Sequence, residues 1–248
     1  MRLALILLAA ATAAQAAPAD VKGALAAPER PAAYVALDAV RRPAEVLAFV
    51  GLERGDRVLD YSAGGGYYTQ IIADAVGPDG LVVGWNPPAF AARPAVSTAL
   101  ANISRRAPNA RFQATSSTAL SFPPDSFDVV LLHLAYHDAY WESADFGFSR
   151  TDPDTVVRAL FRATRPGGVA AVIDHVAAPG RETRAEVDAT HRIDPTVVRA
   201  DFERAGFVFD GESDLLRNPA DDHARRVFDG AIRGRTDRFV YRFRRPAA

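Results

Sequence analysis

Apolar and polar residues alternate in blocks along most of the chain, and two kinds of block recur. Short runs of branched apolar residues indicate buried strands, whereas apolar residues three and four positions apart indicate helices. The predicted strands cover residues 57–61, 81–85, 110–115, 127–133, 169–174 and 238–244, with another starting at 207. The predicted helices cover residues 36–50 in two pieces divided by Pro43, 67–76, 95–107, 153–162 and 195–205. Strands that alternate with helices predict an α/β fold, with a doubly wound, mainly parallel sheet of about seven strands.

The two ends of this pattern differ from its middle. Residues 17–33 are rich in Ala and Pro and are predicted to form a linker. Near the other end, a polar stretch without helical period, 212–237, precedes the alternating strand 238–244. We expect that stretch to loop over the sheet edge or over the functional site. The pattern contains no internal repeat and no second core, so residues 34–248 are predicted to form one domain.

The N-terminal residues have the pattern of an export signal. A positive start, Met1-Arg2, precedes the apolar run 3–8, and Ala14-Gln15-Ala16 supplies the small-x-small pattern that signal peptidases accept. The apolar run is too short to cross a bilayer comfortably. We predict a signal peptide over residues 1–16, cleavage after Ala16 or Ala17, and a periplasmic or secreted protein without a stable membrane anchor. An uncleaved anchor is the alternative.

Composition and charge narrow the class of protein. Apolar residues make up 49% of the chain and charged residues 24%, which is typical of a globular domain and excludes a mainly disordered chain. The 29 basic residues nearly balance the 30 acidic ones, so the chain offers no positive field for nucleic acid. The absence of cysteine excludes disulfides, thiol catalysis and Cys-ligated zinc.

One turn carries most of the candidate chemistry. The first predicted strand contains Asp60 near its end, and the glycine-rich turn Ser62-Ala63-Gly64-Gly65-Gly66 leads from it into a helix. Glycines let a turn bend sharply and let a ligand approach the backbone, and the start of a helix offers free N–H groups. Such a turn is a weak signal by itself, because similar glycine clusters also serve as tight turns.

The surroundings of this turn strengthen the signal. The segment Val58–Thr69 resembles the first motif of class I S-adenosylmethionine-dependent methyltransferases, Asp125–Val130 resembles their fourth-strand motif, and Arg162–Val169 resembles the entry to their fifth strand. The resemblance extends over about residues 36–244. It is closest to a group of exported bacterial predicted methyltransferases, which have a similar Tyr-His-Asp after strand four. The resemblance implies a Rossmann-like fold, S-adenosylmethionine as cofactor, and in-line methyl transfer. We expect a small-molecule acceptor, but the sequence does not distinguish it from a lipid or a protein, and the oligomeric state stays open.

The resemblance also implies roles for residues at matching positions. Asp60 would orient the turn and reach the amino-acid part of the cofactor, and Gly64 and Gly66 would give that part room. The implied cofactor-binding residues are Asp60, Ser62, Gly64, Gly66, Tyr67, Asn86, Ser116 and Ser117.

Three positions depart from the family's pattern. Asn86 stands where the family usually has an acidic residue that binds both ribose hydroxyls, so a weaker bond is expected there. Ser62 replaces the first glycine of the turn. Ser116 or Ser117 stands in the place of an acidic residue near the adenine. These departures predict a lower affinity for the cofactor rather than a different fold.

The candidate catalytic residues follow the fourth predicted strand. Ligands of open α/β sheets bind beyond the carboxyl ends of the strands, and Tyr136-His137-Asp138 lies just past such an end. An imidazole oriented by a carboxylate suits the deprotonation of an oxygen or nitrogen acceptor. The hypothesis is that His137 is the base, Asp138 orients it, and Tyr136 lines the acceptor pocket. The aromatic residues that follow, up to Phe148, could form a lid or an acceptor wall.

Other interpretations stay open. Asp138, Asp174, His137 and His175 could meet at the strand ends and hold a divalent ion in a metal-assisted enzyme. No His-x-x-x-His pattern supports such a site, and the main interpretation assigns no metal. A non-catalytic binding protein on a methyltransferase scaffold would agree with export away from the cytoplasmic methyl donor and with Asn86. A nicotinamide-dependent oxidoreductase is a weaker alternative, because the turn is not Gly-x-Gly-x-x-Gly.

Overall fold

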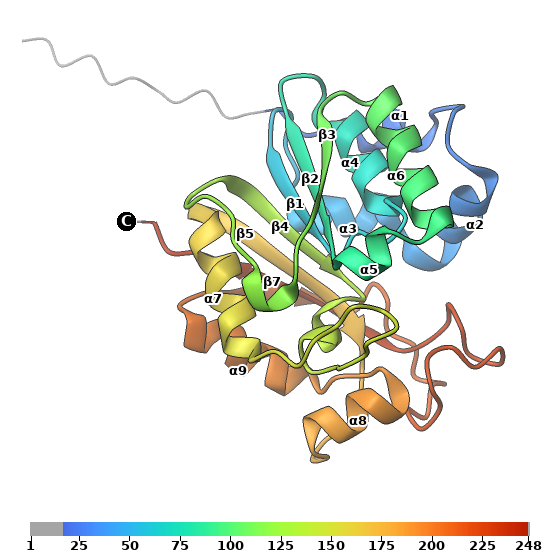
Figure 1. Ribbon diagram of the computed structural model, residues 1–248, viewed down its shortest axis with the longest axis vertical. Coiled ribbons are helices and arrows are strands. Elements are labelled where there is room, and N and C mark those ends of the chain that lie inside the picture. The colour runs from blue at the N-terminus through green and yellow to red at the C-terminus, as the bar shows by residue number, and fades with distance from the viewer. Residues whose placement is uncertain (1–16, 248) are drawn as a thin grey trace, which may run out of the picture.

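A seven-stranded sheet runs through the middle of the molecule (Figure 1). In the computed structural model, which describes residues 17–247, the strands are β1 (Arg57–Tyr61), β2 (Leu81–Asn86), β3 (Ala110–Ala114), β4 (Phe127–His133), β5 (Thr164–His175), β6 (Val208–Ser213) and β7 (Arg238–Arg244). Their order across the sheet is β3-β2-β1-β4-β5-β7-β6. The pairs from β3 to β5 are parallel, and β7 is antiparallel to both of its neighbours. The predicted α/β fold with a mainly parallel sheet is confirmed.

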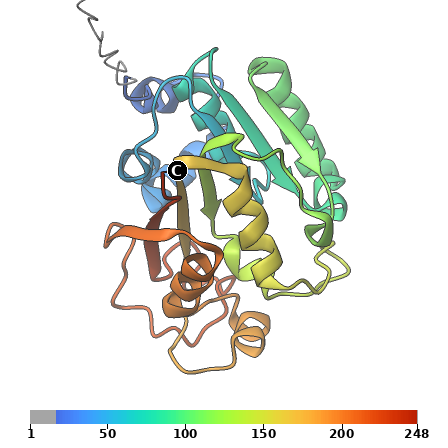
Figure 2. The same ribbon diagram turned by 90° about the vertical axis from the view of Figure 1, so that its left-hand side faces the viewer.

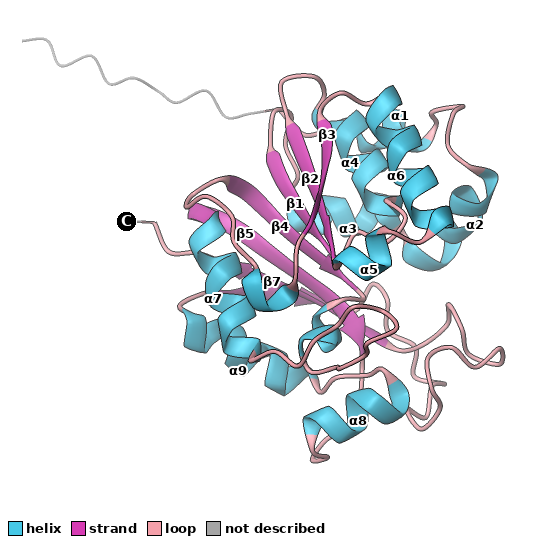
Figure 3. Cartoon of the chain, viewed as in Figure 1, coloured by secondary structure: helices cyan, strands magenta, loops and turns pink. Residues whose placement is uncertain are grey.

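Helices cover both faces of this sheet (Figure 3). They are α1 (Val21–Leu25), α2 (Ala32–Arg41), α3 (Pro43–Val50), α4 (Tyr67–Val76), α5 (Pro88–Ala91), α6 (Pro94–Arg106), α7 (Pro153–Ala163), α8 (Thr183–Thr190) and α9 (Pro195–Ala205). Alternate residues of β1 face opposite layers: Val58 packs with α3, α4 and α6, whereas Leu59 packs with α7 and α9. Because both faces are covered, the strands read as continuous apolar runs.

The segment predicted as a linker is folded. Residues 21–25 form α1, and Asp20 caps it by accepting a hydrogen bond from Gly23 N at 2.9 Å. Ala24 is buried in the same core cluster as the helix α4. The linker prediction is therefore wrong for this segment, because an Ala-rich composition also allows a short helix to pack closely against the core, as Ala24 does. The predicted signal peptide, residues 1–16, lies outside the described residues.

The polar stretch before β7 lies beyond the sheet, beside α8 (Figure 2). It has no helix, as predicted, and several contacts hold it in place. Arg192 and Asp221 form a fully buried ion pair at 2.8 Å, and Val227 N donates to Thr190 O at 3.1 Å. The stretch is therefore fixed to the end of α8. Among residues 17–247, no helix combines the length and the apolar content that a bilayer crossing demands.

Candidate active site

A cavity of about 220 Å³ lies beside the glycine turn between β1 and α4. Ser62, Gly64 and Gly66 all have left-handed backbone conformations, with φ of 58°, 59° and 86°. A Cβ on Gly64 would meet no atom within 4 Å, whereas a Cβ on Gly66 would lie 2.4 Å from Ile103 Cδ1. Gly64 therefore leaves room for a ligand. Contrary to the prediction, Gly66 serves the packing of α6 against the turn.

Three polar groups in the wall of this cavity lack a partner. Tyr68 Oη and His133 Nε2 are buried and form no hydrogen bond. Within residues 17–247, the guanidinium of Arg41 makes no hydrogen bond or ion pair, and it lies over the Tyr67 ring, 4.4 Å from the ring centroid. Burial lowers the pKa of Arg41. Because an unpaired buried polar group costs about 1–3 kcal/mol, Tyr68 Oη and His133 Nε2 indicate a ligand that pairs with them. The half-buried guanidinium of Arg41 favours an anionic ligand.

Asp60, on β1, lines the same cavity. Its carboxylate accepts a hydrogen bond from Thr69 Oγ1 at 2.6 Å, which ties β1 to α4. Burial raises the pKa of Asp60 to about 6, against the opposing effects of Thr69 and of the Arg41 charge. The cavity thus has one acidic and one basic wall, which suits the two charges of an amino-acid group.

Helix α2 covers the cavity, and the sequence analysis missed its contribution. Tyr34, Leu37 and Arg41 line the cavity, and their spacing of three and four residues places them on one face of the helix. Tyr34 donates a hydrogen bond to Gly65 O at 2.7 Å, which fixes the helix to the turn. The sequence does contain a signal for this contribution, because Tyr34, Leu37 and Arg41 are spaced to lie on one face of a helix.

The polar groups at the ends of β2 and β3 are arranged differently. Asn86 is buried, and its amide accepts a hydrogen bond from Gly64 N at 2.9 Å and donates one to Gly64 O at 3.0 Å. Ser116 and Ser117 pair with nearby threonine hydroxyls at 2.8 and 3.0 Å. The side chain of Asn86 therefore locks the glycine turn instead of facing the cavity, which corrects the prediction of a ribose contact.

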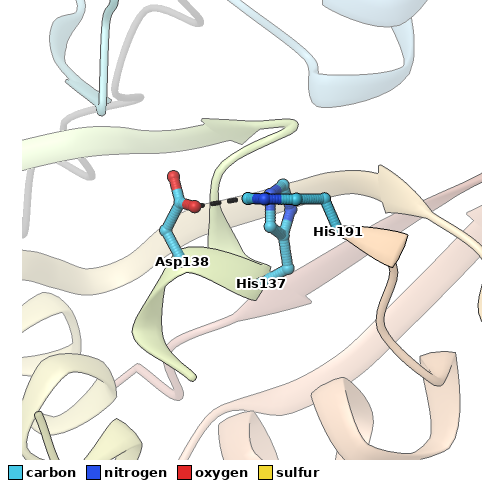
Figure 4. Close-up of side chains that lie close together, drawn as sticks. All are labelled: His137, Asp138 and His191. Atoms are coloured by element: carbon cyan, nitrogen blue, oxygen red, sulfur yellow. Dashed lines mark ion pairs between the residues drawn. The ribbon is translucent and has the colours of Figure 1, made fainter. Parts of the chain in front are cut away.

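A second polar cluster lies past the carboxyl ends of β4 and β5 (Figure 4). His137 Nδ1 lies 2.8 Å from Asp174 Oδ1, and the His137 backbone N–H donates to Asp174 Oδ2 at 3.0 Å. On the other side of the ring, Nε2 lies 3.4 Å from Asp138 Oδ1. The His191 ring centroid lies 5.5 Å from that of His137. Asp174 is thus the residue that orients His137, which corrects the role predicted for Asp138.

The charges around His137 change its expected chemistry. Burial acts to lower the pKa of His137, but the charges of Asp174 and Asp138 outweigh it and raise the pKa to about 9. The two carboxylates thus favour the protonated ring, whereas a general base needs a free ring nitrogen. Burial raises the pKa of Asp138 to about 6, against the effect of His137. The role of His137 as a base therefore stays a prediction, with Asp174 as its partner.

The aromatic residues after β4 divide between the core and this cluster. Tyr136 is fully buried and donates a hydrogen bond to Asp201 Oδ2 at 2.6 Å, so it belongs to the core beneath α9. The prediction that Tyr136 lines an acceptor pocket is therefore wrong. Trp141 packs against His191, with ring centroids 4.6 Å apart, and against Phe148 at 5.4 Å. Trp141 and Phe148 thus form a wall beside His191.

The fold and the cavity define an α/β protein with a ligand site at its first strand–turn–helix unit. Residues 52–216 match the family described as "Methyltransferase domain". The chain belongs to this family, within the class I S-adenosylmethionine-dependent methyltransferases. The resemblance of the three sequence motifs to that class is confirmed.

Individual relatives are distant. The chain is similar to the ubiquinone/menaquinone biosynthesis C-methyltransferase UbiE of Pasteurella multocida, with 24% identity over 131 residues, 50% of this chain and 41% of that protein. It therefore spans less than half the length of this curated relative. A SAM-dependent methyltransferase from Aquifex aeolicus has a similar fold, with a TM-score of 0.57, 16% identity, and 84% of this chain and 98% of that chain covered. A 1,6-didemethyltoxoflavin-N1-methyltransferase from Burkholderia thailandensis, solved with S-adenosylhomocysteine, gives a TM-score of 0.56 at 18% identity, with coverage of 87% and 81%.

Proposed function

We propose that this protein transfers a methyl group from S-adenosylmethionine to a small-molecule acceptor. The observation that carries the proposal is the cavity over Gly64, in which Arg41 and Tyr68 Oη have no partner among residues 17–247. Family membership supplies the reaction class, and the cavity supplies a place for the cofactor at the carboxyl end of β1.

The residues of the cavity fit the amino-acid end of this cofactor. Arg41 and Tyr68 Oη would bind its carboxylate, and Asp60 would hold its ammonium group directly or through water. Gly64 would allow the ligand to approach the backbone. A charge-assisted bond to Arg41 is worth about 1.5–3 kcal/mol.

The nucleoside end has fewer partners among the described residues. The cavity of about 220 Å³ is smaller than the roughly 300 Å³ at which pockets for drug-sized ligands begin, so it holds only part of the cofactor. Asn86 would support binding indirectly, because it fixes the conformation of Gly64 through two hydrogen bonds. We expect a modest affinity, since no carboxylate stands free at the end of β2 to pair with ribose hydroxyls.

The chain's contribution to the reaction is alignment. When bound, S-adenosylmethionine supplies an electrophilic methyl group on a sulfonium. Holding two reactants in line supplies about 7–11 kcal/mol of the barrier. Leu134 lines the cavity and lies three residues before His137, so the cluster of Figure 4 flanks the side from which an acceptor would approach.

Binding and transfer are tested separately. Calorimetry of the protein with S-adenosylmethionine, S-adenosylhomocysteine and NAD is expected to show binding of the first two only. Incubation with methyl-labelled S-adenosylmethionine and a periplasmic extract is expected to yield a labelled small molecule. Binding without any labelled product would favour a non-catalytic binding protein, an alternative that the internally paired Asn86, Ser116 and Ser117 support. No binding of either sulfur compound would overturn the proposal.

Export is a further part of the proposal. It rests on the sequence alone, through the positive start, the apolar run and the Ala14-Gln15-Ala16 pattern. Mass spectrometry of the protein from its native cell is expected to find an N-terminus after Ala16 or Ala17 in the periplasm or the medium. A retained Met1 would overturn this part and leave the cavity argument untouched.

A further inference from the structure

We propose that His137, Asp138 and His191 form a binding site for one divalent transition-metal ion of the zinc type. Each of the three offers a ligand atom, and these atoms lie within 4.8 Å of one another (Figure 4). Two imidazoles and one carboxylate form a donor set that suits zinc and its first-row neighbours rather than magnesium or calcium. The inference does not depend on methyl transfer, because the three residues meet whatever the cavity over Gly64 binds.

The surroundings of His137 match those of a metal-bound imidazole. Asp174 lies 2.8 Å from Nδ1 and also accepts the His137 backbone N–H at 3.0 Å. Metal-ligating histidines commonly give their second ring N–H to a carboxylate in this way, which fixes the tautomer and the orientation of the ring. The remaining nitrogen, Nε2, points to Asp138 Oδ1 at 3.4 Å. An ion bound there would replace the proton on Nε2, which would leave to solvent.

The three ligands come from two elements whose positions the fold fixes. His137 and Asp138 lie in the short turn after β4, and His191 ends α8 with a left-handed φ of 54°. A non-glycine residue in this conformation is held there by its surroundings. His137 and His191 are 5% and 2% exposed, whereas the Asp138 side chain is 14% exposed, so an ion would reach the site from the side of Asp138.

One contact opposes the ion. Arg226 donates a hydrogen bond to His191 Nε2 at 2.9 Å, so this nitrogen acts as an acceptor and its ring carries the proton on Nδ1. Binding through either nitrogen of His191 therefore requires Arg226 to give up this bond. The guanidinium would compete with the ion, and its removal should favour the metal.

Metal binding is measured directly. The protein is treated with a chelator, freed of it, and dialysed against Zn²⁺ or Co²⁺ at neutral pH. We expect one ion per chain, and for Co²⁺ a visible absorption band that cannot come from thiolates, because the chain has no cysteine. We expect Asp138→Asn and His191→Gln each to weaken the binding by at least about tenfold, and Arg226→Met to strengthen it.

The matched control is His223→Gln. His223 is a partly exposed histidine that also pairs with a carboxylate, Asp237, at 3.0 Å, but it lies outside the three-residue group. It should leave the stoichiometry and affinity unchanged. Far-UV circular dichroism checks that each variant is folded, and the Arg226→Met gain keeps the test decisive if a ligand variant unfolds. Failure of the wild-type protein to bind an ion, or equal binding by wild type, Asp138→Asn and His191→Gln, would overturn the site.

Discussion

At the carboxyl end of β1, polar groups face a cavity without partners, whereas at the ends of β2 and β3 they are paired within the protein. The first, which we call the open region, contains Arg41 and Tyr68 Oη, which have no partner among residues 17–247. The second, which we call the closed region, contains Asn86, with its two hydrogen bonds to Gly64. Unpaired buried groups lower the stability of a chain without ligand, and paired ones maintain it. Substitutions in the two regions should therefore change stability in opposite directions.

The largest effect is expected at Asp60, in the open region. Its folded pKa of about 6 lies above the ordinary Asp value of 3.8, and the groups that face it are Thr69, Tyr68 and the Arg41 cation. The folded chain thus binds this proton more tightly than the unfolded chain does. The stabilisation that this proton contributes is complete below about pH 4. It is lost as the pH rises towards 6, and above that pH the protein stays less stable by this amount.

Asp60→Asn should remove this penalty. The variant is expected to be more stable than wild type at pH 7.5 by about 3 kcal/mol, at 1.36 kcal/mol per pKa unit, and the difference should vanish near pH 4. Urea unfolding at both pH values measures it. A variant that is less stable at pH 7.5, or a difference that does not change with pH, would contradict the raised pKa.

Arg41→Met gives the next effect and separates binding from stability. The change removes the cation but keeps an unbranched apolar chain over the Tyr67 ring. We expect S-adenosylhomocysteine to bind about 10- to 100-fold more weakly, which corresponds to one charge-assisted bond. The melting temperature should be unchanged or higher, since no ion pair is lost within the described chain. Calorimetry and thermal unfolding measure the two effects.

The control for Arg41 is an arginine without a role in the cavity. Arg111 is exposed on β3, outside the cavity lining, and Arg111→Met should change neither the affinity nor the melting temperature. Equal loss of affinity in both variants would point to a general charge effect and would remove Arg41 from the site.

Asn86→Ala tests the closed region. The substitution leaves the N–H and the C=O of Gly64 without the amide, and we expect a loss of about 1–3 kcal/mol of unfolding free energy. The affinity for S-adenosylhomocysteine should fall as well, because the turn loses its fixed shape. An unchanged denaturation midpoint with a large loss of affinity would instead mean that Asn86 contacts the ligand directly, as the sequence predicts.

The predictability of these regions from the sequence follows from how local their determinants are. The apolar runs that form strands, and the break between two helices at Pro43, depend only on neighbouring residues, and the structure confirms both. The orientation of His137 depends on Asp174, 37 residues away, which the parallel pairing of β4 with β5 brings alongside. No local pattern identifies that partner.

The direction in which a polar side chain points is also not predictable from a local sequence pattern. Asn86 follows a predicted strand, as a ribose ligand would, but its amide turns to Gly64, 22 residues earlier. A neutral amide can accept from the N–H and donate to the C=O of one residue, whereas a carboxylate can only accept. The departure from the family's acidic residue therefore changed the partner of this position and not only the strength of its bond.

The smallest effect is expected at Ser116, also in the closed region. Its hydroxyl pairs with Thr118 Oγ1 at 2.8 Å in an exposed turn, and it caps the short helical turn that follows. Ser116→Ala should change the unfolding free energy by no more than about 0.5 kcal/mol. The affinity for S-adenosylhomocysteine should stay within about twofold of the wild-type value. Urea unfolding and calorimetry measure both. A larger loss of affinity than in Arg41→Met would place the main recognition at the end of β3. It would reverse the contrast between the two regions, since a hydrogen-bonded hydroxyl would then contribute more than a half-buried cation that has no protein partner among the described residues.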